Sequence, residues 1–118
     1  MDMKLKKYKQ FNHINELKFS NINQLQKEFL ELKNKWIEEV GYQSNPNILY
    51  SDVNYRRIVS FGKRIVPILF EDIKQHGGDW FTALVEIFKF DPVNCDNQGN
   101  IELMTQDWQK YLESTHVI

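Results

Sequence analysis

The stretch GKRIVPILFEDIKQHGGDWFTALVEIFKFDP, residues 62–92, decides the fold because it contains two consecutive helix patterns. Apolar side chains in its first half recur three and four residues apart, as on one face of an α-helix: Ile65, Ile68, Leu69 and Ile73. Pro67 is tolerated only in the first turn of a helix, because it lacks an N–H group and clashes with the preceding turn. We therefore expect a helix that begins near Arg64 or Ile65 and ends at Gly77 and Gly78.

The second half of this stretch predicts another helix directly after the glycines. Asp79 has the side chain of an N-cap, and Trp80 and Phe81 fall in the first turn. The inner face comprises Ala83, Leu84, Ile87 and Phe88. Val85 and Phe81 make the helix apolar on nearly all sides, which indicates a central position. Asp91 and Pro92 are expected to break it.

Towards the N-terminus, residues 21–41 predict one long amphipathic helix. Asn21 followed by Gln24 has the form of a capping box, and Gly41 is a suitable end. One continuous apolar stripe follows helical spacing: Ile22, Leu25, Phe29, Leu32, Trp36 and Val40. The same spacing is close to a heptad and could also support a partner helix, although it is short for a coiled coil.

Two shorter helices complete the pattern, separated from their neighbours by polar loops. Residues 42–50 read as a loop, after which Ser51 or Asp52 can cap a helix that Gly62 stops. This helix carries Tyr55, Ile58 and Val59. Asn100 is a suitable cap for the last helix, whose apolar side comprises Ile101, Met104, Trp108, Tyr111 and Leu112.

These patterns predict an all-α fold: a single small domain of about five helices over residues 1–118. Within it we expect a basic N-terminal arm over 1–19, the long helix over 21–41 and a compact helical unit over 51–114. A chain of 118 residues with 42% hydrophobic residues suits one core. We expect Trp36 and Trp108 to anchor it from the first and last long helices.

The charge of the chain is nearly balanced, with 15 Lys and Arg against 16 Asp and Glu. A general field that would attract nucleic acid or anionic lipid is therefore not expected. Apolar runs such as residues 65–70 are too short to span a bilayer, and no secretory signal pattern is present. With one cysteine, Cys95, an intramolecular disulfide is excluded. We expect a cytoplasmic protein without a membrane partner.

Side chains with catalytic or metal-binding chemistry are scattered. His13, His76 and His116 have no second ligand at helical spacing, and Cys95 has no His close in sequence. The loop from residue 94 to residue 105 matches early positions of an EF-hand, but Thr105 stands where the bidentate Glu is required. A polar turn explains that loop better. We expect no catalytic residues, no metal ligands and no cofactor.

Positive charge gathers in two places. Lys4, Lys6, Lys7 and Lys9 are typical of a solvated arm, with a tail for an acidic partner or nucleic acid as the alternative. The second place, here called the basic corner, comprises Arg56, Arg57, Lys63 and Arg64 beside Tyr55. It could grip phosphates or an acidic protein, with Tyr55 exposed for stacking. The alternative, which we favour, is a solvated turn neutralised by Asp52, Glu71 and Asp72.

The chain from Gly62 to Trp108 also carries a recognisable order of uncommon residues in the segments GKRIVPILFEDI, DWFTALVEIFKFDPV and MTQDWQKYL. It resembles a group of small uncharacterised bacterial proteins, and it is similar to a HEAT-type helical hairpin. The positions that carry the resemblance are Gly62, Pro67, Trp80, Phe81, Ala83, Leu84, Asp91, Pro92, Met104 and Trp108. The resemblance covers the C-terminal half. It implies a scaffold and no activity.

The sequence thus predicts a non-enzymatic protein–protein interaction module, an accessory or adaptor subunit of a larger bacterial complex. Candidate partner-binding residues are the basic corner, Tyr55 and Trp80, because the chain holds more large aromatics than a small core readily hides. One alternative is a nucleic-acid-binding accessory protein that uses the corner. Another is a toxin or enzyme component completed by a partner. The oligomeric state is left open.

Overall fold

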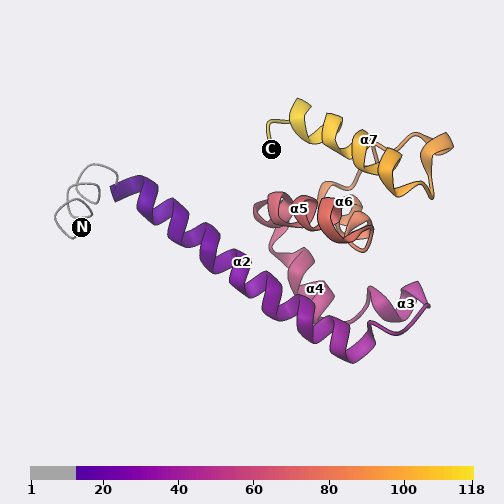
Figure 1. The fold of residues 1–118 in the computed structure, drawn as a ribbon, viewed down its shortest axis with the longest axis horizontal. Helices are drawn as coiled ribbons and strands as arrows, with labels where there is room; N and C mark the ends of the chain where they lie inside the picture. Colours follow the sequence, from indigo (N-terminus) through magenta and orange to yellow (C-terminus); the bar gives the residue numbers. More distant parts are fainter. Residues whose placement is uncertain (1–12) are drawn as a thin grey trace.

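The computed structural model describes the backbone of residues 13–118 and the side chains from residue 22 onward. These residues form six α-helices and two short 3-10 turns, and none of residues 13–118 lies in a strand. The predicted all-α small domain is confirmed. In Figure 1 the long α2 runs along one side of the molecule, α5 and α6 occupy the middle, and α7 lies on the opposite side.

The long helix α2 spans His13–Val40, so the predicted start at Asn21 is wrong. No Gly or Pro interrupts residues 13–21, and the Gln24 side chain donates to Glu28 Oε1 at 3.4 Å, one turn onward. Phe29 and Trp36 are buried as the stripe predicts, whereas Ile22 at its beginning is 56% exposed. The lysines at positions 4 to 9 lie outside the described residues.

The predicted loop after Gly41 contains a short helix, α3 (Pro46–Leu49). The Asn45 side chain accepts a hydrogen bond from the Asn47 N–H at 2.9 Å, and Pro46 stands in the first turn. The indole Nε1 of Trp36 donates to the Leu49 carbonyl at 2.7 Å and so holds α3 against α2. One helical turn is too short to show periodicity, which is why the pattern missed it.

Helix α4 (Val53–Ser60) begins as expected at Asp52, whose side chain accepts from the Asn54 N–H at 2.9 Å. It is followed by the 3-10 turn η1 (Gly62–Ile65), which starts with Gly62 at a φ of 69°. This left-handed conformation favours glycine. Helix α5 (Val66–His76) has Pro67 in its first turn and ends at Gly77, so its predicted bounds are confirmed to within two residues.

Helix α6 (Phe81–Phe88) departs from the sequence prediction at both ends. Trp80 takes the N-cap position, and its side chain does not cap the helix. The glycine turn before it continues until the Phe81 N–H donates to the Gly78 carbonyl at 3.4 Å. Asp79 is therefore not the cap. The helix ends at Lys89, in a left-handed conformation with φ of 54°, two residues before Asp91.

The last helix, α7 (Ile101–Ser114), begins at Asn100, whose side chain accepts from the Leu103 N–H at 3.1 Å. The predicted cap is confirmed. The loop before it contains the 3-10 turn η2 (Cys95–Asn97). Asp107 accepts from the Asn97 amide at 2.8 Å and from the Asn94 N–H at 3.1 Å, which ties this loop to α7.

Two groups of aromatic rings form much of the core. Trp80 is central to the first, with ring centroids 5.3 Å from Phe29, 5.2 Å from Trp36 and 5.0 Å from Tyr55. The second joins α6 to α7 through Phe88 and Trp108, 5.8 Å apart. Trp36 and Trp108 are buried, as predicted. The first group fixes α2 and α4 around the turn that precedes α6.

Candidate functional site

The most concentrated polar cluster surrounds Asp72, a nearly buried carboxylate of α5. Lys33 of α2 approaches its two oxygens at 2.8 and 3.0 Å, and the Trp80 indole donates to Oδ2 at 2.6 Å. His76 Nδ1 lies 3.0 Å from Oδ1. One carboxylate therefore connects α2, α5 and the beginning of α6.

Burial alone would raise the pKa of the Asp72 carboxyl, but Lys33, Trp80 and His76 stabilise the ionised form and lower the pKa overall. The sequence contains one signal for this cluster. Asp72 stands three residues after Leu69, on the buried face of α5, where a carboxylate requires partners. Its main partner, Lys33, lies 39 residues away, and no local pattern could identify it.

The basic corner is not a single cationic site. Arg56 Nη1 lies 3.0 and 2.8 Å from the two oxygens of Glu86 on α6, and this hydrogen bond to Glu86 raises the pKa of Arg56. The predicted neutralisation by Asp52, Glu71 and Asp72 is wrong. Asp52 caps α4, Glu71 pairs with Lys74, and Asp72 pairs with Lys33.

Tyr55 and Trp80 are fully buried, so the structure places neither candidate on the surface. The hydroxyl of Tyr55 donates to the Asp79 carbonyl at 2.8 Å, and burial raises the pKa of Tyr55 far above its usual range. The prediction of an exposed tyrosine beside the cations is wrong because Tyr55 shares the inner face of α4 with Ile58, three residues onward.

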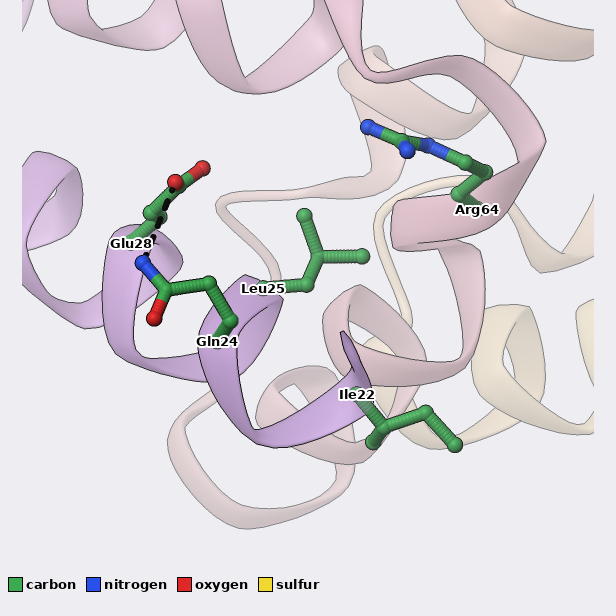
Figure 2. A pocket seen from close by; sticks show the side chains of 5 residues that line it. All are labelled: Ile22, Gln24, Leu25, Glu28 and Arg64. Carbon is green, nitrogen blue, oxygen red and sulfur yellow. Dashed lines mark hydrogen bonds between the residues drawn. The ribbon is translucent and has the colours of Figure 1, made fainter. Parts of the chain in front are cut away.

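The other three corner residues are exposed but face different surroundings. Lys63 lies over the Phe88 ring and Arg64 over the Phe61 ring, each 5.7 Å from the centroid. Figure 2 shows Arg64 across a shallow pocket from Leu25 and Glu28 of α2. Arg57 lines a neighbouring pocket together with Glu28 and Glu31. Acidic side chains of α2 thus stand near both arginines.

A different surface lies on α2 itself, and of its three residues only Ile22 belongs to the stripe predicted from sequence. Ile22, Leu30 and Ile37 are 56%, 49% and 47% exposed, and we call them the α2 strip. They are eight and seven residues apart, close to two helical turns, so they share one side of α2. Leu30 and Ile37 each directly follow a buried aromatic residue, which places these two side chains about 100° around the helix from the core face. Ile22, seven residues before Phe29, lies close to the line of the core stripe and is exposed near the beginning of the described side chains.

The α2 strip borders a groove between α2 and α5, here called the α2–α5 groove, with a volume of about 470 Å³. Ile22, Gln26 and Leu30 form one wall, and the α5 wall comprises Pro67, Ile68, Glu71, Gln75 and His76. The charged groups along this groove already have partners, because Glu71 pairs with Lys74 and Asp72 pairs with Lys33 and His76. The groove therefore offers apolar and amide surface.

Among the side chains that the structure describes, residues 22–118, no group of three or more His, Cys, Asp or Glu is placed to hold a metal ion. No helix in the described part of the chain is both long and apolar enough to cross a membrane. Comparison of the chain with protein families, with curated proteins and with solved structures gave no match.

Proposed function

We propose that this protein is a non-enzymatic protein-binding module, an accessory or adaptor subunit, and that it binds an amphipathic helix along the α2 strip and the α2–α5 groove. The observation that carries the proposal is the alignment of Ile22, Leu30 and Ile37 on one side of α2, with Ile22 and Leu30 also lining that groove. Single exposed apolar residues are ordinary on protein surfaces, but a row of them on one helix beside a groove is the arrangement used for helix docking.

The chemistry of the groove favours the apolar side of a helix as its occupant. Its two walls carry Ile22, Leu30, Pro67 and Ile68, and their separation by a groove provides contacts on two sides of an inserted helix. A charged ligand would find no available counter-charge, because Glu71 and Asp72 are already paired. Gln26 and Gln75 provide hydrogen bonds at the edges.

Replacing Leu30 by Lys should abolish capture of the partner and leave the fold unchanged. The substitution places a charge where the proposed helix packs, yet the side chain is already 49% exposed and contributes little to folding. The tagged parent and variant are compared by quantitative co-purification and by thermal melting.

Val53→Lys is the matched control, because Val53 is 72% exposed and lies outside the strip and groove. We expect this control to retain the partner. Equal capture by the Leu30 variant and the parent would refute this binding surface.

A second candidate function, nucleic-acid binding, rests on Arg57, Lys63 and Arg64. All three are exposed, and none forms an ion pair with a carboxylate among the described residues. The nearby Glu28 and Glu31 weaken the local positive field, which is why we rank this function second. The third alternative, an enzyme component completed by a partner, remains a prediction from sequence.

If the corner binds nucleic acid, the double variant Arg57→Glu with Arg64→Glu should lose at least about tenfold in affinity, and binding by the parent should weaken steeply with salt. Fluorescence anisotropy with a labelled duplex at several salt concentrations measures both effects. Arg56 is left intact in this variant because its pair with Glu86 connects α4 to α6. Binding that is insensitive to both changes would remove this candidate.

A further inference from the structure

We propose that the helix received by the α2 strip is α2 of a second copy of this chain, lying antiparallel to the first. This inference rests on the binding surface proposed above and specifies its occupant. Symmetric pairing of identical chains requires a surface that complements itself, so that each residue meets its counterpart across a twofold axis. The α2 strip meets this requirement in both its spacing and its charge.

The spacing of the strip is nearly symmetric about its centre. Leu30 lies eight residues after Ile22 and seven before Ile37. When two copies of α2 run in opposite directions with their Leu30 side chains opposed, Ile22 of each copy comes opposite Ile37 of the other. All three apolar side chains then meet apolar counterparts. A parallel pair would also place apolar residues opposite each other. In the antiparallel pair, however, the positive end of each helix dipole lies beside the negative end of the other, which is favourable.

The charges along the same seam are compatible with self-association. Gln26 lies four residues before Leu30 and Asn34 four residues after it, so the antiparallel arrangement opposes two neutral amides. In this register Lys33 of one copy comes level with Lys27 of the other, and the ammonium of Lys33 is already bound to Asp72. Asp72 therefore compensates one member of this like-charged pair, which limits the repulsion between the two copies. The net charge of −1 per chain adds little repulsion.

The contact is expected to be modest in size. From Ile22 to Ile37 the strip extends about 22 Å along the helix. A contact of this length, supplemented by the α5 wall of the groove, belongs with the smaller interfaces, so we expect dimers that dissociate on dilution, with a dissociation constant on the order of micromolar or weaker.

Sedimentation equilibrium of the full chain from about 1 to 300 μM tests the proposal. The parent should shift from 14.2 kDa towards twice that mass as its concentration rises. Leu30→Glu and Ile37→Glu should each remain at the lower mass with an unchanged circular dichroism spectrum, and Val53→Glu should behave like the parent. Two strip variants are used so that misfolding of one leaves the test intact.

Disulfide trapping in a Cys95→Ser background determines the direction. A mixture of the Ile22→Cys and Ile37→Cys proteins should cross-link to each other, and neither alone should do so. Self-linking of the Ile22→Cys protein would indicate parallel helices and overturn the arrangement.

A parent that stays at 14.2 kDa at all concentrations would overturn the inference. In that case the co-purification experiment with Leu30→Lys still tests whether the α2 strip binds a different protein. Loss of a partner there would assign the strip to a different protein, whereas unchanged capture would refute both proposals. A dimer that persists in both strip variants would likewise refute the proposed interface.

Discussion

Replacing Trp80 by Ala should lower the free energy of unfolding by about 3–5 kcal/mol, as is typical when a buried large aromatic is truncated. Trp80 has no exposed surface, and its ring contacts Phe29, Trp36 and Tyr55 at centroid distances of 5.0 to 5.3 Å. A domain of this length has a stability of roughly 6–18 kcal/mol, so the loss could unfold much of the population at a moderate temperature. Urea denaturation followed by circular dichroism measures it.

Trp80→Phe separates the two roles of this side chain. Phenylalanine keeps part of the ring packing but cannot donate to Asp72, so the variant should fall between the parent and Trp80→Ala. A Trp80→Ala protein within about 1 kcal/mol of the parent would contradict the central position of this residue.

Replacing Asp72 by Ala should cost about 3–5 kcal/mol, because removing one partner of a buried ion pair leaves the other charge uncompensated. The side chain of Lys33 is only 14% exposed, and the Trp80 indole would also lose its acceptor. The neighbouring pair of Glu71 and Lys74 provides the control, since its side chains are 57% and 45% exposed. Glu71→Ala should change stability by less than about 1 kcal/mol. Similar losses from both variants would contradict a special role for Asp72.

The contribution of Asp72 should also depend on pH in a defined direction. Its pKa is lower in the folded chain than the usual value of about 3.9, so its stabilising effect is complete above that value and is lost as the pH falls through the folded pKa. The stability difference between the parent and Asp72→Asn should therefore narrow below about pH 4. Denaturation curves from pH 7 to pH 2 provide the measurement.

The longer helices could be predicted from sequence because their apolar residues repeat over several turns. The sequence indicates Asn100 as a cap, and Asp52 as one of two candidates with Ser51, because such hydrogen bonds are local, to Leu103 and Asn54. The predictions of Asn21 and Asp79 as caps are wrong. Polar residues of the same types also occur inside helices and in turns, and the tertiary fold decides which of them accepts a hydrogen bond from a backbone N–H.

Contacts between distant parts of the chain could not be predicted in this way. Lys33 meets Asp72 across 39 residues and Arg56 meets Glu86 across 30, and no periodicity records either pair. Burial of Tyr55 could have been inferred from its position three residues before Ile58. The exposure of Ile22, Leu30 and Ile37 could not, because α2 is apolar over more of its circumference than the rest of the molecule covers.

The burial of Trp36, Trp80 and Trp108 determines the intrinsic fluorescence of the protein. Every tryptophan of the chain is enclosed, so the folded protein should emit at short wavelength and show a marked red shift when urea admits water to the rings. A helix that binds at Leu30 would not contact these buried indoles directly. Intrinsic fluorescence should therefore change strongly on unfolding and very little on complex formation. Binding titrations accordingly require a dye attached to the exposed Cys95.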